Sequence, residues 1–197
     1  LRQNVNAIRS TLDRQKILLV VKADAYGHGA VEVAREALAA GVEMLGVATL
    51  HEGIELRRAG IAAPVLVLSP CLASETPEIV EHGLRCTVSH LGFLAALGRA
   101  ARAAQTVAPV HLEVDTGMGR SGVAPEEAEP LAQAIAGEPG LRLEGLFTHF
   151  PAADAPDLCF SHQQLARFLD LRAAIERLGI AVSLVHAANS AGLARIP

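Results

Sequence analysis

The stretch Ile17-Leu-Leu-Val-Val-Lys22-Ala-Asp-Ala-Tyr-Gly-His-Gly29 places an aliphatic run directly before a glycine-rich turn. A short run of branched aliphatic residues that ends in such a turn is typical of a strand buried on both faces of a parallel sheet. The amphipathic segment that follows has the length of a crossover helix. The stretch therefore predicts one strand, one turn and one helix.

The same unit recurs along the whole chain. Seven strands are predicted, at Ile17–Lys22, Met44–Thr49, Val65–Ser69, Arg85–Ser89, Val110–Asp115, Leu143–His149 and Ser183–Ala188. Helices should fill the gaps. The first helix, Leu1–Leu12, should bury Leu1, Val5, Ile8 and Leu12, and the helix Phe160–Leu178 should bury Leu165, Phe168, Leu169, Ile175 and Leu178, with Gly179 at its C-cap.

An unbroken series of strands and helices fits either an open doubly wound sheet or a TIM-type (β/α)8 barrel. The strand count favours the barrel, with seven of its eight strands present. Seven strands would leave two unpaired edges, so an eighth strand is expected beyond Pro197. We therefore expect one incomplete α/β barrel domain over residues 1–197, truncated at both ends.

Composition excludes several classes of protein. A chain of 197 residues that is 51% hydrophobic and 19% charged suits one large core. The net charge of −4, the single Tyr and the lack of Trp argue against nucleic-acid binding. No aliphatic run approaches a membrane span, which predicts a cytoplasmic protein without a membrane partner. The three cysteines have no CxxC spacing and the eight histidines no HExxH spacing, so neither disulfides nor a metal are expected.

Lys22 ends the first aliphatic run, at a costly position for a structural lysine. Alternation puts it on one strand face with Leu18 and Val20, so its amine would be partly desolvated, which favours a nucleophile or Schiff-base former. A lysine that extends its amine to solvent at the rim is the alternative. Tyr26 follows beside glycines whose amides can approach an anion, and its phenol can donate a hydrogen bond.

The fifth strand leads into His111-Leu-Glu-Val-Asp-Thr-Gly-Met-Gly-Arg-Ser-Gly122. His111, Glu113 and Asp115 share one strand face and would point into the barrel, where buried charges need partners.

The glycines of this segment also match the GxGxxG dinucleotide pattern, with Glu144 about twenty residues later. We disfavour a nicotinamide site, because Asp115 stands where a pyrophosphate should lie and Pro125 indicates a helix that starts after the third glycine.

Four segments resemble the alanine racemase family of fold-type III pyridoxal-phosphate enzymes. They are Val20-Val-Lys-Ala-Asp-Ala-Tyr-Gly-His-Gly29, the glycine segment from His111 to Gly122, Gly145-Leu-Phe-Thr-His-Phe150 and His186-Ala-Ala-Asn-Ser-Ala191. Each closes a predicted strand, and they occur in the order of the family's motifs. The resemblance runs from end to end of the chain.

The resemblance implies pyridoxal 5'-phosphate as cofactor and the conversion of L-alanine to D-alanine, a cell-wall precursor. Lys22 would be the Schiff-base lysine and one of two bases, because racemisation removes a proton on one face and returns it on the other. Arg120 would bind the cofactor phenolate and the substrate carboxylate, and His149 would lie by the pyridine ring. Tyr26, Asn189 and Ser190 would complete the cofactor site, with Tyr26 and Ser190 at the phosphate.

Glu113 stands where many family members have a lysine that becomes carbamylated. We expect its carboxylate to supply directly the negative charge that orients Arg120; a solvated rim carboxylate is the alternative.

In the family the second base is a tyrosine from a C-terminal β domain of the partner subunit, so the intact enzyme should be a homodimer with a shared active site. No residue of this chain matches that tyrosine, nor the family's eighth strand. The chain alone is therefore expected to be inactive.

Three alternative functions stay open: a pyridoxal-phosphate-binding barrel without turnover, a related barrel decarboxylase and a non-enzymatic interaction module. The sequence does not distinguish alanine from serine as the substrate.

Overall fold

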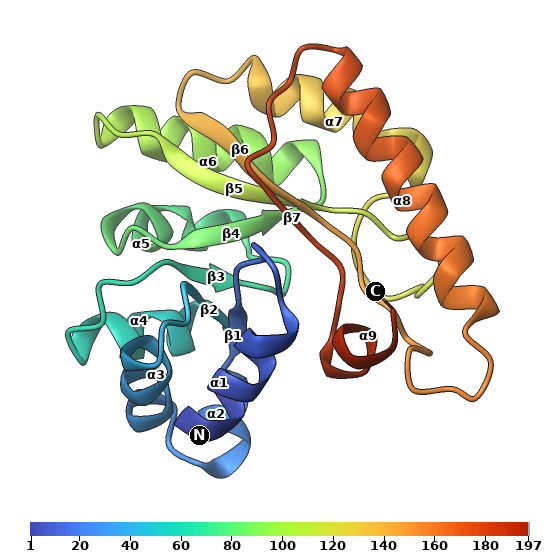
Figure 1. Ribbon diagram of the computed structural model, residues 1–197. Helices are drawn as coiled ribbons and strands as arrows, with labels where there is room; N and C mark the ends of the chain where they lie inside the picture. Colours follow the sequence, from blue (N-terminus) through green and yellow to red (C-terminus); the bar gives the residue numbers. More distant parts are fainter. Residues whose placement is uncertain (197) are drawn as a thin grey trace. The chain divides into compact units, whose positions relative to one another are not determined.

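The computed structural model describes residues 1–196, which form two compact units, one from Leu1 to Cys86 and one from Thr87 onward (Figure 1). Parallel strands alternate with helices in each unit. No helix of the described residues has the length and apolar character needed to cross a lipid bilayer. The prediction of one domain over residues 1–197 stays a prediction.

The first unit is built on a parallel sheet. Leu18 of β1 lies opposite Met44 of β2, and Leu45 of β2 lies opposite Val65 of β3, which in turn pairs with the start of β4. Helix α4 packs on β2 and β3. The elements are α1 (Arg2–Thr11), β1 (Leu18–Val20), α2 (Lys22–Gly27), α3 (Ala30–Ala39), β2 (Met44–Val47), α4 (Leu50–Arg58), β3 (Val65–Val67), the 3-10 turn η1 (Ala73–Glu75), α5 (Thr76–Glu81) and β4 (Arg85–Val88), whose last residues belong to the second unit.

The second unit continues the same alternation. Strands β5 and β6 run parallel, with a bulge between Val110 and His111, and β6 pairs in parallel with β7. The extra residue is Glu144 of β6, which lies between Leu143, opposite Val110, and Gly145, opposite His111; an extra residue of this kind adds local twist. The elements are α6 (Leu91–Ala103), β5 (Ala108–Glu113), α7 (Pro125–Ala136), β6 (Leu141–Phe147), α8 (Cys159–Arg177), β7 (Leu184–His186) and α9 (Ser190–Arg195).

The structure confirms the seven predicted strands within residues 1–196 and shifts their ends. Strand β1 stops at Val20, although the sequence predicted it to reach Lys22. The reason is a tight turn that begins at Lys22 itself. Strands β5 and β6 both begin two residues before their predicted starts at Val110 and Leu143, where Pro109 and Arg142 mask the aliphatic pattern.

The buried face of α8 differs from the predicted one. Leu169 and Leu178, predicted to be buried, are 45% and 42% exposed. The face turned inward is Ser161, Gln164, Phe168, Leu171 and Ile175. The spacing of the leucines predicted the wrong face because two of the five buried side chains, Ser161 and Gln164, are polar. They follow the same helical period as the three buried apolar residues. Gly179, predicted to be the C-cap, lies one residue after the C-cap Leu178 and adopts φ +78°.

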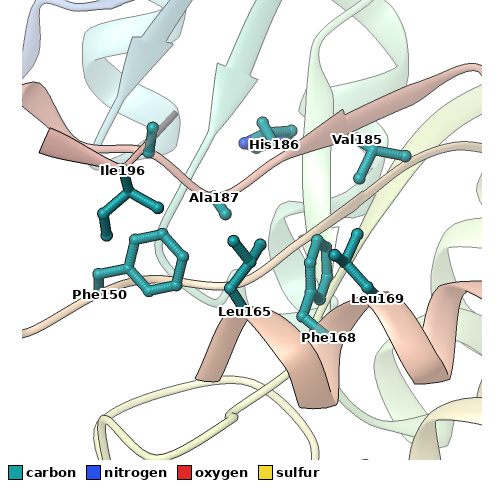
Figure 2. A pocket seen from close by; sticks show the side chains of 9 residues that line it. Phe150, Leu165, Phe168, Leu169, Val185, His186, Ala187 and Ile196 are labelled. Atoms are coloured by element: carbon teal, nitrogen blue, oxygen red, sulfur yellow. The ribbon is translucent and has the colours of Figure 1, made fainter. Parts of the chain in front are cut away.

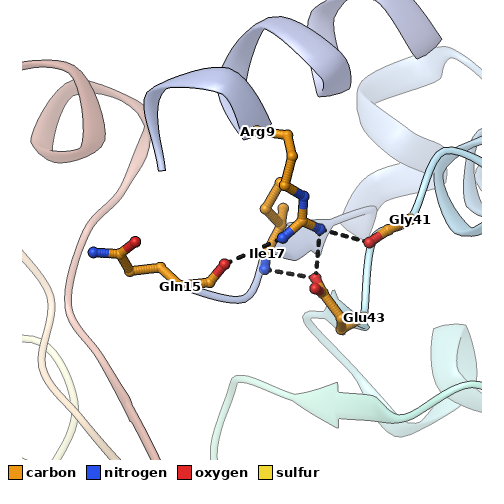
Figure 3. A network of polar contacts seen from close by, with 5 residues as sticks. All are labelled: Arg9, Gln15, Ile17, Gly41 and Glu43. Carbon is orange, nitrogen blue, oxygen red and sulfur yellow. Dashed lines mark hydrogen bonds and ion pairs between the residues drawn. The ribbon is translucent and has the colours of Figure 1, made fainter. Parts of the chain in front are cut away.

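Helix α1 positions the entry to β1. Its predicted apolar face is wrong at Leu1, which is 48% exposed, whereas Val5 is buried. Arg9 donates hydrogen bonds to the carbonyls of Gln15 and Gly41 at 3.1 and 2.6 Å (Figure 3). It also donates to the carboxylate of Glu43.

The Glu43 carboxylate joins Arg9 to the start of β1. Its Oε2 accepts from Arg9 at 2.9 Å and from the Ile17 amide at 2.8 Å (Figure 3). Desolvation of Glu43 opposes its ionisation, but these two hydrogen bonds lower its pKa overall. The network therefore fixes where the strand that leads to Lys22 begins.

Candidate functional site

The segment directly after β1 is a left-handed helical turn. Ala23, Asp24, Ala25 and Tyr26 have φ between 50° and 57° and ψ between 38° and 53°. L-residues other than glycine normally visit this region singly, at a cost of about 1–2 kcal/mol each. Four in succession make this a strained segment, which the surrounding structure must hold in place.

Hydrogen bonds within the first unit hold much of this turn. The Ala25 amide donates to the Val21 carbonyl at 2.9 Å, and the Asp24 carbonyl accepts from the Gly29 amide at 3.0 Å. The Asp24 carboxylate accepts from the Ala30 amide, at the start of α3, at 2.7 Å. Asp24 thus joins the turn to the following helix.

Lys22 and Tyr26, two of the predicted site residues, lie at the two ends of this turn. Lys22 is half-buried, and Tyr26 is 62% exposed. Neither the Lys22 amine nor the Tyr26 hydroxyl is hydrogen-bonded to another residue among those described. Both polar ends are therefore available to a ligand, although Lys22 directly follows Val21, which is 1% exposed.

Within the second unit, three further predicted site residues line one cavity of about 390 Å³. Its volume lies within the range of small-molecule sites. The lining residues are Met118, His149, Phe150, Pro151, Asp154, Asn189, Ser190 and Ala191. The structure thus brings His149, Asn189 and Ser190 together from segments that are about forty residues apart in sequence.

Asn189 already uses most of its side-chain amide within the protein. Its Nδ2 donates to the Phe150 carbonyl at 2.9 Å, and its Oδ1 accepts from the Gly192 amide at 2.8 Å. The second bond caps the start of α9. Asn189 therefore fixes the backbone of Ser190, whose side chain is exposed at the cavity. The predicted contact of Asn189 with a cofactor stays a prediction.

Asp115 organises the glycine loop that carries Arg120. Its Oδ1 accepts from the amides of Gly117 and Met118 at 2.9 and 2.7 Å, and its Oδ2 accepts from the Gly119 amide at 2.8 Å. The loop then returns to β5 through an isolated bridge between Val114 and Val123. A single carboxylate thus folds the loop around itself.

This loop geometry removes the support for a dinucleotide site. The amides of Gly117 and Gly119, which a pyrophosphate would require, donate to Asp115 instead. Helix α7 begins at Pro125, as predicted, and not within the glycine motif. A dinucleotide fingerprint needs free amides at the start of a helix, and neither condition is met here.

We expect Asp115→Ala to unfold this loop and to lower the stability of the protein. Hydrogen bonds to charged groups contribute about 1.5–3 kcal/mol each. Because two of the three are exposed to solvent, we expect less than their full sum, a loss of about 3 kcal/mol. Urea unfolding of the full-length protein measures the change. Asp154→Ala, an exposed acid on the neighbouring cavity wall, is the control. A loss for Asp115→Ala no larger than for this control would contradict the carboxylate's role.

Glu113 lies buried at the end of β5, close to this loop. Its Oε1 accepts a hydrogen bond from the Ser121 hydroxyl at 2.9 Å, whereas its Oε2 is buried without a hydrogen-bond partner in the described chain. Burial raises the pKa of Glu113, and Ser121 and the charge of Arg120 oppose that rise. Arg120 itself is exposed on the loop. The expectation that Glu113 orients Arg120 stays a prediction.

Two histidines, His111 of β5 and His186 of β7, come from the two strands that flank β6. The Nδ1 of His111 and the Nε2 of His186 are 2.9 Å apart, and the His186 ring stacks on Phe147 with centroids 4.6 Å apart. The Nε2 of His111 is 3.5 Å from the Glu144 carboxylate. Burial and the neighbouring His111 lower the pKa of His186 to about 3. A hydrogen bond between two imidazoles requires that at least one ring be neutral, and the lowered pKa makes His186 neutral at physiological pH.

A second, smaller cavity of about 210 Å³ lies between α8 and β7 (Figure 2). Phe150, Leu165, Phe168 and Leu169 point toward it from one side, and Val185 and Ile196 from the other. The only titratable side chain of its lining is His186. The rest of the lining is apolar.

The family model described as alanine racemase, N-terminal domain, matches residues 1–197. The chain belongs to the alanine racemase family. An alanine racemase of Treponema pallidum is 46% identical over 199 residues, which cover 98% of this chain and 52% of that protein. An alanine racemase of Symbiobacterium thermophilum is 41% identical, over 98% of this chain and 51% of that protein.

Solved structures agree on the fold. An alanine racemase structure from Clostridium difficile 630 superposes with a TM-score of 0.97 at 34% identity, covering 100% of this chain and 55% of that chain. A histidine racemase from Leuconostoc mesenteroides superposes with a TM-score of 0.89 at 25% identity, over 98% and 51%. The seven strands thus belong to a TIM-type (β/α) barrel of the alanine racemase family. The chain spans about half the length of the relatives it matches.

Sequence reasoning missed one residue of this alanine racemase domain that contacts the turn at Lys22. Glu52 accepts a hydrogen bond from the Ala23 amide at 2.8 Å. The signal for it was the spacing Thr49-x-x-Glu52 after the second strand, which predicts a capping box. The described residues contain no cluster of side chains that could hold a metal ion.

Proposed function

We propose that the whole protein is a pyridoxal-phosphate-dependent alanine racemase in which Lys22 carries the cofactor. The observation that carries the proposal is the position of Lys22, with its amine unpaired at the start of a strained turn. Strained backbone of this kind clusters at functional sites. Membership of the alanine racemase family and the names of the relatives support the same reaction.

The donors present fit pyridoxal 5'-phosphate. An unpaired lysine amine suits its aldehyde, and the hydroxyls of Tyr26 and Ser190 suit its phosphate. His149 is an aromatic neighbour suited to the pyridine ring, and it lines the cavity together with Ser190. We infer that Lys22, Tyr26, Arg120, His149, Asn189 and Ser190 together form the cofactor site.

The cofactor, when bound, supplies a conjugated system that accepts the electron pair left when the α-proton departs. The Lys22 amine removes or returns the proton on one face of the substrate. Arg120 binds the substrate carboxylate with its guanidinium and so fixes which bond faces Lys22. Tyr26 and Ser190 hold the phosphate end, which keeps the reacting atoms aligned.

We infer that the whole protein acts as a homodimer with a shared active site. Racemisation needs a second base on the opposite face, and Tyr26, the single tyrosine of this chain, is assigned to the phosphate. Sedimentation of the full-length protein tests this inference. A monomer that is fully active would contradict it.

The cofactor assignment is tested on the full-length protein with pyridoxal phosphate, borohydride and peptide mass mapping. Residues 1–197 contain two lysines, Lys16 and Lys22, so Lys16 is a control within this part of the protein. Label confined to Lys22, together with conversion of L-alanine to D-alanine, is the expected result. A folded protein that stays unlabelled, or is labelled at Lys16 alone, would contradict the proposal.

The histidine racemase among the structural neighbours makes substrate choice a separate test. We propose alanine as the substrate because the relatives of highest identity reported above are alanine racemases. Comparing kcat/KM for alanine, serine and histidine decides the question. Release of carbon dioxide from any amino acid would instead favour the barrel decarboxylase.

Glu113→Gln should make the protein less active and, at neutral pH, more stable. The pKa of Glu113 is raised on folding, so its contribution to stability is full below its ordinary value of 4.5 and is lost as pH rises through the raised value. A neutral glutamine does not suffer that loss. If the carboxylate orients Arg120, kcat/KM should fall about tenfold or more, the effect of losing one charge-assisted contact.

Thermal melts from pH 4 to pH 8 check the predicted change in stability, and kinetics on the same samples check the predicted loss of activity. The melting-temperature difference between Glu113→Gln and wild type should become more positive with rising pH. Glu126→Gln, an exposed acid in the first turn of α7, should change neither quantity. Unchanged kinetics for Glu113→Gln would remove its assigned role.

A further inference from the structure

The Glu52 carboxylate joins the ends of two neighbouring strands. Its Oε1 accepts from the Ala23 amide at 2.8 Å, just after β1. Its Oε2 accepts from the amides of Ala48 and Thr49 at 2.6 and 3.1 Å, just after β2. Both oxygens of one half-buried side chain are therefore bound to backbone amides.

Only part of this arrangement is an ordinary helix cap. Thr49 and Glu52 form a capping box at the start of α4, in which the Thr49 Oγ1 accepts from the Glu52 amide at 3.4 Å. A capping box needs one carboxylate oxygen, directed to the N-cap amide. The other oxygen instead reaches the Ala23 amide, 29 residues earlier in the chain.

The Ala23 amide has a specific need for this acceptor. It lies in the first turn of a helical segment, where amides have no acceptor within the helix. It is also the first of the four left-handed residues. Glu52 therefore satisfies this amide at the point where the backbone leaves Lys22 and reverses its hand.

We propose that Glu52 is a positioning residue: it holds the turn after Lys22 in its left-handed form and so fixes the Lys22 amine and the Tyr26 hydroxyl. The claim that Glu52 fixes the Lys22 amine for chemistry rests on the proposed function. The claim that Glu52 holds the backbone turn in its left-handed form is independent of it. The two are therefore tested by separate measurements.

Three variants of the full-length protein separate the roles of Glu52. In Glu52→Gln the amide oxygen can keep the capping box, whose motif also accepts glutamine, so its NH2 group is left facing the Ala23 amide. Thr49→Ala removes the reciprocal cap and leaves the carboxylate. Glu55→Gln is the matched control, because Glu55 is an exposed acid three residues after Glu52 on the same helix, α4.

Hydrogen exchange of the cofactor-free protein tests the backbone claim. Amides in the peptide covering residues 22–30 should exchange about tenfold faster in Glu52→Gln, the change expected for loss of one charge-assisted hydrogen bond. Thr49→Ala and Glu55→Gln should exchange in this peptide as wild type does. Equal exchange in Glu52→Gln and wild type would overturn the proposal.

The rate of borohydride-trapped attachment of pyridoxal phosphate at Lys22 tests the chemical claim. It should fall about tenfold in Glu52→Gln and stay unchanged in the two other variants. Faster exchange with an unchanged attachment rate would overturn the positioning of Lys22. Absence of attachment in wild type would instead refute the proposed function, while hydrogen exchange still decides the backbone claim. Should Glu52→Gln fail to fold, Glu52→Asp, which keeps the charge but is one methylene shorter, carries the same expectations.

Discussion

Replacing Lys22 with Arg abolishes attachment of pyridoxal phosphate and lowers racemisation by about 10³-fold or more, if the proposed function holds. Arginine keeps the positive charge and most of the length of lysine, but its guanidinium stays protonated and cannot attack an aldehyde. The Lys22 amine has no hydrogen-bond partner among the described residues, so the fold should tolerate the change. Borohydride trapping, D-alanine formation and circular dichroism measure the three effects.

Lys16→Arg is the matched control for this experiment. Lys16 is exposed before β1 and is the only other lysine of the sequence. Attachment and racemisation should match wild type in this variant. Full racemisation by a folded Lys22→Arg protein would refute the assignment of Lys22.

Gly145→Ala should destabilise the protein by overpacking its interior. Gly145 is buried in β6, and a Cβ there would overlap the His111 ring. The ring cannot move aside easily, since His186 lies at hydrogen-bonding distance from one nitrogen and Glu144 lies near the other. Overpacking of this kind costs about 1–3 kcal/mol, and loss of the histidine contact would add to it.

Denaturant unfolding measures this cost. Gly137→Ala is the control, because Gly137 has a right-handed backbone at the end of α7 and an added Cβ would come no closer than 3.4 Å to its neighbours. Its stability should change by less than about 1 kcal/mol. Equal stabilities of the two variants would show that His111 does not fill the space beside Gly145.

Strands β1 and β3 were predictable because each is a short run of branched aliphatic residues, whereas β4, Arg85–Val88, contains only one such residue. The left-handed turn after Lys22 was not predictable. Glycines at positions 27 and 29 signalled a turn, but nothing in Ala23 or Ala25 signals a positive φ. Hydrophobic periodicity reports which side chains are buried and carries no information on backbone handedness.

The candidate site was predictable from the sequence motifs, but its supporting contacts were not. Lys22, His149 and Ser190 were located through the motifs that close their strands. Glu52 and the Ala23 amide are 29 residues apart, and His111 and His186 are 75 apart, so no local pattern pairs them. Asp115 is the exception, because it stands next to the glycines whose amides it binds.

The left-handed turn also limits how much mutation the first unit can tolerate. A chain selected for stability alone would place glycine or asparagine in those positions, where a positive φ costs little. Four strained residues lower the margin between folded and unfolded chain by several kcal/mol, of the same order as the whole stability of a typical domain. Destabilising substitutions elsewhere in residues 1–86 should therefore unfold this protein at a smaller total cost than they would a protein without the turn. We accordingly expect the sequence of residues 1–86 to change slowly in evolution.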